Sequence, residues 1–156
     1  MKKQGFTLIE LMVVIVIMGI LAAVAVPKLF GMIAKSKASE VPTAAGTWIN
    51  MQDAFYQEKS DVGTWPEIGY SAPGTASTNK STYSSNVITF SGAETHNWVA
   101  TPINALNDCT HSMSWQLNAS VRNNDVQIAD GTDSASRPCL DLTASWSNLL
   151  KNNPTN

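Results

Sequence analysis

The feature that most constrains this chain is an almost unbroken apolar run from Phe6 to Val26, in which only Thr7 and Glu10 are conventionally polar. A helix of about 20 apolar residues, at a rise of about 1.5 Å per residue, is long enough to cross the hydrocarbon core of a bilayer. Burying a lone carboxylate costs roughly 2–3 kcal/mol at the bilayer centre and less near an interface, so an acid in such a helix needs a partner. The sequence therefore predicts a membrane helix with one functional acid, Glu10, near its end.

A partner for Glu10 is created if the chain is cut after Gly5. Cleavage there gives Phe6 a free α-amino group four residues before Glu10. In a stack of parallel helices, the ammonium of one subunit would meet the carboxylate of a neighbour, and a buried charge is tolerated when it is paired in this way. We therefore expect cleavage between Gly5 and Phe6, and we expect Glu10 to set the register of assembly.

The segment KKQGFTLIE, residues 2–10, and the apolar run after it resemble the N-terminus of a type IV prepilin. The resemblance is close over about the first thirty residues and extends to the rest of the chain only in layout. It implies cleavage by a prepilin peptidase, N-methylation of Phe6, and helical filament assembly with the apolar helices bundled at the centre. Gly19 and Pro27 stand where the family commonly has a Gly and a Pro, which bound a stretch that loses helical structure in assembled filaments.

The resemblance also implies where the protein resides and what it contacts. The unassembled subunit would lie in the inner membrane, and the assembled homo-oligomer would be an extracellular surface filament built by a pilus assembly platform. The expected segments are a leader at residues 1–5, a transmembrane and filament-core helix at 6–27, and an amphipathic helix half at 28–60. The remaining residues, 61–156, form a globular β head that makes one domain with residues 28–60.

Two simpler interpretations explain part of the same N-terminus. In a secretory signal, Lys2 and Lys3 would be the basic region and Ala23-Val24-Ala25 the cleavage site, but a charge at Glu10 serves no purpose in a disposable segment. A plain membrane anchor explains the apolar run and the basic residues before it, yet it leaves Glu10 without a reason.

Beyond Pro27 the apolar residues become one-sided, at steps of three, four and seven, which predicts an amphipathic helix to about Lys59. Pro42 within the pattern predicts a kink or local break near Ser39–Pro42, and Ser60-Asp61-Val62-Gly63 is expected to end the helix. The expected core face of this helix is formed by Phe30, Ile33, Val41, Ala45, Trp48 and Phe55.

Residues 63–80 are rich in turn signals and predict a connecting loop. In the strand predicted at 112–121, five apolar residues alternate strictly with polar ones, which places one face toward the helix and one toward solvent. Asn123-Asn124 favours a hairpin after this strand, and Pro102 suggests an edge or bulged strand. The expected fold is α+β, a long helix packed on a small antiparallel sheet of about four strands, at 82–90, 97–106, 112–121 and 125–129.

Cys109 and Cys139 are the only cysteines, and a pair in an exported chain indicates one disulfide. On the chain-entropy model, closing such a loop stabilises the fold by roughly 3–4 kcal/mol. The alternatives are two free thiols or half of a metal site, but no C-x-x-C spacing or nearby histidine pair supports a metal. The resemblance agrees with the disulfide, because many pilins close a C-terminal loop in this way.

Charge and motifs argue against several function classes. Without Lys2 and Lys3 the net charge is −4, which disfavours bulk affinity for nucleic acid. The sequence shows neither an HExxH, a GxSxG nor a phosphate-binding glycine loop, so we expect no enzyme and no cofactor, and we expect His96 and His111 to be surface or packing residues. Asp130 and Asp133, with Asp125 nearby, could ligate calcium, although an ordinary Asp-Gly turn is favoured.

Two further functions stay open from the sequence. A calcium-bearing loop would favour a pseudopilin of type II secretion, the nearest alternative within the superfamily. A filament-borne adhesin would use the head to bind polysaccharide, with Trp65, Tyr70 and Tyr83 as exposed stacking surfaces. The sequence does not distinguish a major from a minor pilin, nor motility from adhesion, DNA uptake or secretion.

Overall fold

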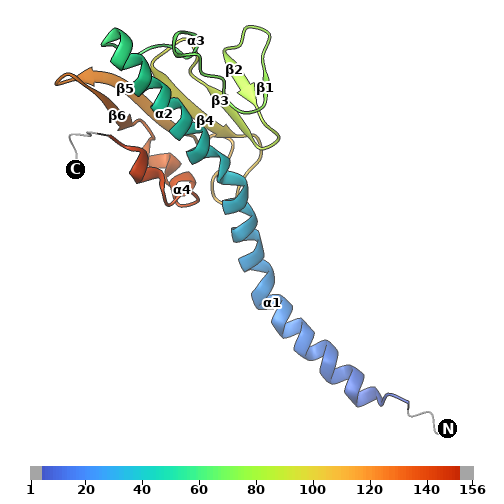
Figure 1. The fold of residues 1–156 in the computed structure, drawn as a ribbon. Coiled ribbons are helices and arrows are strands. Elements are labelled where there is room, and N and C mark those ends of the chain that lie inside the picture. Colours follow the sequence, from blue (N-terminus) through green and yellow to red (C-terminus); the bar gives the residue numbers. More distant parts are fainter. Residues whose placement is uncertain (1–4, 152–156) are drawn as a thin grey trace. The chain divides into compact units, whose positions relative to one another are not determined.

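The computed structural model describes residues 5–151 and falls into two compact units, one ending at Ile33 and one beginning at Ala34 (Figure 1). Residues 1–4 of the predicted leader lie outside the described part. The helical segment Leu8–Lys59 contains the one stretch among the described residues that is long and apolar enough to cross a membrane. The helices are α1 (Leu8–Ala38), α2 (Glu40–Lys59), α3 (Trp65–Ile68) and α4 (Arg137–Leu140), with 3-10 turns η1 (Ser134–Ser136) and η2 (Trp146–Leu149).

The break predicted near Ser39–Pro42 is confirmed. α1 ends at Ala38 and α2 begins at Glu40, while Ser39 between them keeps right-handed helical angles. Pro42 has no N–H to donate toward Ala38, and its ring crowds that carbonyl, so the hydrogen-bond ladder is interrupted locally. The predicted end is also confirmed, because Ser60 adopts a left-handed conformation and donates its N–H to the carbonyl of Tyr56 at 2.8 Å.

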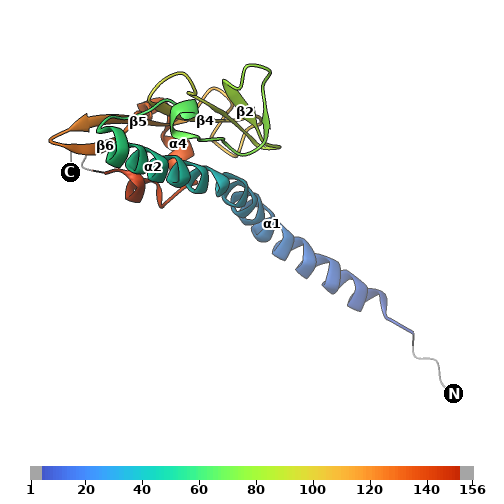
Figure 2. The ribbon, with the colours of Figure 1, turned by 45° about the horizontal axis from the view of Figure 1, so that its top comes forward.

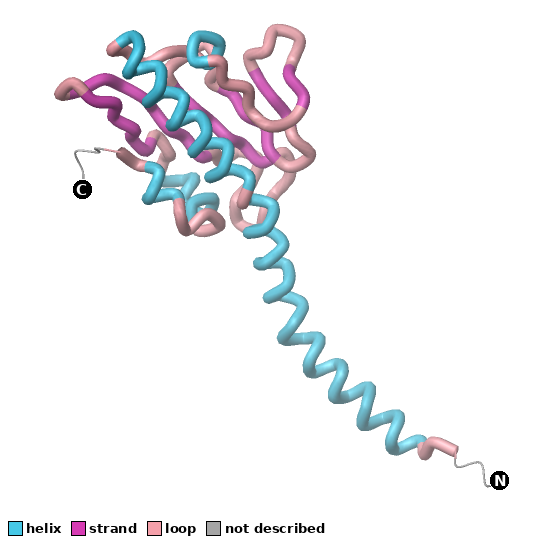
Figure 3. Tube along the Cα trace, in the orientation of Figure 1, coloured by secondary structure: helices cyan, strands magenta, loops and turns pink. Residues whose placement is uncertain are grey.

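Within residues 5–151 the sheet has six antiparallel strands rather than about four as predicted, and each strand pairs with its neighbours in chain order (Figure 3). The strand predicted at 82–90 is two strands, because Ser85 turns the chain between them: its hydroxyl oxygen accepts from the N–H groups of Val87 and Ile88 at 3.1 and 2.9 Å. The strands are β1 (Thr75–Ala76), β2 (Thr82–Ser84), β3 (Ile88–Ser91), β4 (Asn97–Pro102), β5 (Trp115–Arg122) and β6 (Asp125–Asp130).

Three other local predictions meet different outcomes. The predicted loop at 63–80 also contains the short helix α3 and the strand β1. The expectation that Pro102 marks an edge or bulged strand is wrong, because β4 pairs with β3 and β5, and Pro102 is its last residue opposite Ile88. The hairpin at Asn123-Asn124 is confirmed, with both residues at positive φ between β5 and β6.

The helix α2 lies against one face of the sheet, which we call the inner face (Figure 2). Val41, Ala45 and Trp48 of the predicted stripe are fully buried, and Phe55 is half-buried. Phe30 and Ile33 are 61% and 48% exposed, so the prediction that they belong to the core is wrong. The inner face of the sheet contributes buried apolar side chains at Ile88, Phe90, Trp98, Ala100, Trp115, Leu117, Val126 and Ile128.

Two polar groups link the core to the loop after α2. The side chain of Gln52 donates to the carbonyl of Gly63 at 2.7 Å and accepts from its N–H at 3.0 Å, as a backbone neighbour would. The Trp98 indole donates to the Tyr70 hydroxyl at 3.0 Å, which donates to the carbonyl of Ala44 at 3.1 Å. Burial raises the pKa of Tyr70 to about 12.

The last described residue, Lys151, pairs with the edge strand β6. Lys151 forms an antiparallel bridge with Ile128, and its ammonium lies 2.9 Å from Asp53 of α2 and 3.5 Å from Asp125. The hydrogen bond to Asp53 raises the pKa of Lys151. This contact joins the C-terminal segment to both layers of the head.

We expect Gln52→Leu to lower the free energy of unfolding by about 1–3 kcal/mol, because the N–H and carbonyl of Gly63 would stay buried without a partner. Gln57→Leu is the matched control, since Gln57 is exposed on the same helix and should change stability by less than about 0.5 kcal/mol. Urea unfolding followed by tryptophan fluorescence measures both. Equal stabilities for the two variants would contradict the role given to Gln52.

Candidate functional site

The N-terminal unit exposes an apolar surface of unusual extent. Every large apolar side chain of α1 from Leu8 to Ile33 is among the exposed hydrophobics, with values such as 76% for Leu8 and 65% for Met18. Soluble monomers rarely expose a contiguous patch of this kind, and patches that do occur are sites of membrane or protein contact. This surface is therefore the first candidate functional site.

Glu10, the one acid on this surface, has a partner in the described chain. Its Oε2 accepts from the backbone N–H of Thr7 at 2.8 Å and from the Thr7 hydroxyl at 2.7 Å. In return, the N–H of Glu10 donates to the Thr7 hydroxyl oxygen at 3.3 Å. This reciprocal arrangement is a capping box, which satisfies the N–H groups of Thr7 and Glu10 where α1 begins.

The residues flanking the predicted cleavage point are accessible. Phe6 is 87% exposed and precedes the first turn of α1. A side chain added at Gly5 would meet no atom of the described residues within 4 Å. Packing within the described chain therefore gives no reason for a glycine at this position, which leaves recognition by another protein as the reason to examine.

Gly19 and Pro27 lie within the continuous part of α1. A side chain at Gly19 would also meet no described atom within 4 Å, and Pro27 is accommodated inside the helix. Both residues weaken a helix, Gly by about 1 kcal/mol relative to Ala and Pro by removing one hydrogen bond. The single chain is helical through both, and the break expected there in an assembled filament stays a prediction.

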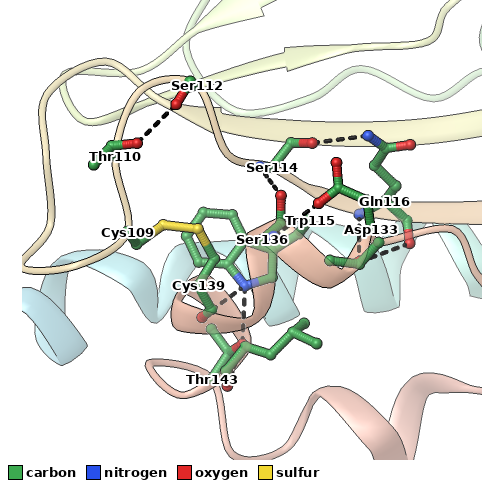
Figure 4. Close-up of a disulfide and its surroundings, with 12 residues drawn as sticks. Cys109, Thr110, Ser112, Ser114, Trp115, Gln116, Asp133, Ser136, Cys139 and Thr143 are labelled. Carbon is green, nitrogen blue, oxygen red and sulfur yellow. Dashed lines mark hydrogen bonds between the residues drawn. A yellow bond between two sulfur atoms is a disulfide. The ribbon is translucent and has the colours of Figure 1, made fainter.

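The second candidate region is the C-terminal loop closed by the predicted disulfide, which is present between Cys109 and Cys139 (Figure 4). The Trp115 indole donates to the carbonyl of Cys139 at 3.1 Å and to the hydroxyl of Thr143 at 3.0 Å. Asp133 accepts from the N–H of Ser136 at 2.7 Å and caps η1. The segment around Cys139 is thus joined to Cys109, in the connection before β5, by a covalent bond, and to β5 itself by the buried indole of Trp115.

The three aspartates considered for calcium serve separate structural roles. Asp125 contacts Lys151, while Asp130 accepts from the N–H of Thr132 at 2.9 Å and lies 3.4 Å from the Trp146 indole nitrogen. Asp133 caps η1. Within residues 5–151, no group of three or more His, Cys, Asp or Glu side chains could hold a metal ion.

The aromatic residues considered for polysaccharide stacking are buried, so that prediction is wrong. Trp65, Tyr70 and Tyr83 are only 1%, 4% and 9% exposed, although they line a small hollow beside Lys80. The Trp65 indole donates to the carbonyl of Asn97 at 3.1 Å, and its ring lies 4.9 Å from that of Tyr70. These rings pack against one another. By contrast, His96 and His111 are exposed, in agreement with their expected surface position.

Comparison with known proteins bears on the N-terminal site directly. Residues 1–26 match the family model described as the prokaryotic N-terminal methylation motif. The resemblance to type IV prepilins is confirmed. The matched residues include Gly5, Phe6 and Glu10, together with the exposed apolar surface of α1 as far as Val26.

Curated relatives support the same family. The chain is 41% identical over 75 residues to the type IV major pilin protein PilA of Myxococcus xanthus, which covers 44% of this chain and 34% of that protein. It is 42% identical over 86 residues to the fimbrial protein EcpC of Eikenella corrodens, covering 55% and 54% of the two chains. It is 43% identical over 70 residues to the type IV major pilin protein PilE1 of Neisseria gonorrhoeae, covering 45% and 41%.

These matches cover between 34% and 54% of the length of the three relatives. The names describe pilin and fimbrial proteins rather than enzymes, which is consistent with the expectation of a structural role.

The structure also contains two hydrogen-bonding residues whose roles the sequence analysis missed, Thr7 and Gln52. The spacing Thr7-x-x-Glu10 just before an apolar run is a capping-box signal and would have identified the first.

We expect Cys109→Ser combined with Cys139→Ser to lower the stability of the head by roughly 3–4 kcal/mol, because the denatured chain loses its cross-link. The double substitution avoids a free thiol. Thermal unfolding of the oxidised wild type, with and without reductant, measures the same effect independently. A melting temperature that reductant leaves unchanged would contradict a stabilising disulfide.

Proposed function

We propose that this chain is the structural subunit of a type IV pilus-like surface filament. The observation that carries the proposal is the coincidence of the methylation motif at residues 1–26 with an exposed apolar helix surface that bears one acid. Such a surface must be covered by lipid, by other copies of the helix, or by each in turn. A subunit that leaves the membrane for a helical bundle has this surface covered first by lipid and then by other copies of the helix.

In this proposal the subunit is processed before it assembles. A prepilin peptidase cleaves between Gly5 and Phe6, and Phe6 is N-methylated. Until it assembles, the apolar part of α1 holds the chain in the inner membrane, and an assembly platform then transfers it to the extracellular filament. The open space around Gly5 supports recognition rather than packing as the reason for this glycine.

Glu10 would direct the docking of an incoming subunit. Within the described chain, the capping box engages Oε2 of Glu10, and a carboxylate can accept about four hydrogen bonds. The other oxygen would accept the ammonium of Phe6 from a neighbouring subunit. Because no hydrophobic effect draws helices together within lipid, one charge pair at a fixed height is an effective means of selecting the axial offset.

A pseudopilin of type II secretion is the alternative within the same superfamily. The feature that would have favoured it, a calcium-bearing aspartate loop, finds no support in residues 5–151, where Asp125, Asp130 and Asp133 act separately. The names of the curated relatives also describe pili and fimbriae. Imaging surface filaments in a strain that lacks only this chain tests the proposal as a whole, and undiminished filaments would reject a major-subunit role.

We expect Gly5→Arg to accumulate as an uncleaved precursor, because a peptidase that approaches the backbone closely cannot accommodate the long charged side chain. Gly5→Ala is the graded control, since a Cβ added at this position meets no described atom within 4 Å and should not disturb folding. N-terminal sequencing of the mature wild-type protein should begin at Phe6. A start at Val26 would replace the prepilin interpretation with the secretory signal.

We expect Glu10→Gln and Glu10→Val to be cleaved and retained in the membrane but not assembled. The pair separates two roles of Glu10, because Gln retains the ability to cap the helix while Val loses both cap and charge. Thr7→Val is the matched control that removes the capping hydroxyl and keeps the charge, and it should still assemble. Filament counts by electron microscopy give the result.

Two outcomes would contradict this role. If the Gln variant assembled normally while the Val variant failed, helix capping rather than charge would be the contribution of Glu10. Normal filaments built only from the Val variant, with an unchanged rise per subunit, would show that Glu10 does not set the register.

A further inference from the structure

Glu40, the first residue of α2, is a carboxylate with one oxygen engaged and one open. Its Oε1 accepts from the hydroxyl of Ser85 at 2.6 Å, and the residue is half-buried. Its Oε2 forms no hydrogen bond or ion pair with any residue of the described chain. A partly desolvated carboxylate is stabilised by a nearby cation. The open oxygen is therefore a candidate acceptor for a cation from outside the subunit.

Glu40 lines a hollow that can hold the stem of such a cation. The hollow has a volume of about 330 Å³ and lies between the first turns of α2 and the loop residues Tyr70, Ser71 and Pro73. Thr43 and Thr47 also line it, and their hydroxyls already donate to backbone carbonyls one turn earlier, at 3.3 and 3.1 Å. Covering these hydroxyls therefore leaves no donor without an acceptor. A lysine fits this surface, because its aliphatic stem can lie along the hollow while its ammonium reaches the carboxylate.

Two lysines in the last turn of α1, Lys35 and Lys37, are exposed and form no ion pair within residues 5–151. Ser39 keeps right-handed helical angles, so the helical rotation of about 100° per residue continues from these lysines to Glu40. Lys35 is then about 140° from Glu40 around the helix, and Lys37 about 60°. Lys35 and Glu40 of one subunit therefore point to nearly opposite sides and cannot pair with each other.

The pairing proposed for Glu10 sets the axial step between adjacent subunits. When the ammonium of Phe6 is level with Glu10 of a neighbour, the incoming subunit is displaced by four residues, or about 6 Å along a helix. Filament symmetry displaces every part of a subunit by the same axial step. Lys35 of the incoming subunit is then level with Ser39 of its neighbour, one residue from Glu40. This contact rests on the proposed function, because the filament sets the register.

We propose that Glu40 binds the ammonium of Lys35 from an adjacent copy of this chain. Copies related by a step along a filament make head-to-tail contacts, in which the two contacting faces lie on roughly opposite sides of the subunit. Lys35 and Glu40 meet this condition. Lys37 of the incoming subunit is equally close in height, but it lies on the same side of the helix as Glu40 and so points away from that neighbour.

The test expresses each variant as the only copy of the chain in the cell and counts surface filaments by electron microscopy. Glu40→Gln keeps a carbonyl oxygen for Ser85 and removes the charge, whereas Lys35→Glu places two carboxylates together. We expect each variant to reduce filament numbers at least about tenfold. The exchange of Glu40→Lys with Lys35→Glu rebuilds the pair in reverse and should restore filaments to within about threefold of the wild type. In the exchange variant the Ser85 hydroxyl keeps the carbonyl of Ile88, 3.1 Å away, as an acceptor.

Lys37→Glu is the matched control. It makes the same change of charge two residues from Lys35, also in the last turn of α1, where a cation interacts favourably with the helix dipole. We expect this variant to form filaments as the wild type does. Tryptophan fluorescence and membrane fractionation establish that each variant is folded and inserted.

Three outcomes would overturn the inference and leave the proposed function intact. Normal filament numbers from Lys35→Glu would show that this lysine is not the partner of Glu40. Equal losses from Lys35→Glu and Lys37→Glu would assign the effect to overall charge rather than to one pair. An exchange variant that assembles no better than either single variant would show that the two residues do not meet. A wild type that forms no filaments of this chain would reject the proposed function, and the pair with it.

Discussion

The packing of α2 on the inner face of the sheet is the interaction on which the rest of the structure depends. All five tryptophans are at most 3% exposed, among them Trp48 of α2 and Trp98 and Trp115 of the sheet. The apolar surface of the core is buried within the head itself, because the apolar side chains of α2 and of the sheet cover one another. The exposed apolar surface that remains is concentrated in α1, where internal packing of the head offers it no partner.

A subunit of the proposed kind needs a stable head and a helix that contacts lipid and other subunits, and different parts of the chain meet these two needs. The head achieves stability by local means, through its core, the Cys109–Cys139 disulfide and the pairing of Gln52 with Gly63. The apolar half of α1 contributes little to that core, since the only buried residues of the helix are Ala34 and Ala38 near its end. Its sequence is therefore free to be selected for contacts with lipid and with other subunits.

Periodic patterns in the sequence predicted the larger elements, and tertiary contacts decided the details. The break before Pro42, the end at Ser60 and the Asn123-Asn124 hairpin follow from local backbone chemistry, which neighbours in sequence determine. Ser85, where the chain turns, donates its hydroxyl to Glu40, 45 residues away, and the Trp65 indole donates to a carbonyl 32 residues away. For Trp65, the turn-rich composition suggested an exposed loop. In the structure its indole donates to the carbonyl of Asn97 on β4, a partner that no local sequence pattern could identify.

The candidate site shows a similar limit, because the sequence motif identified Glu10 but not the groups that surround it. Glu67 in the head accepts from the N–H and hydroxyl of Thr64 at 2.8 and 2.7 Å, the same distances as those between Thr7 and Glu10. The hydroxyl of Thr64 is the main cause that lowers the pKa of Glu67, which is exposed to water. The capping geometry therefore does not distinguish a structural acid from a functional one. The difference lies in the surroundings: water solvates the remaining charge of Glu67, whereas an apolar surface transferred into lipid or a helix bundle leaves the charge of Glu10 in need of a cation.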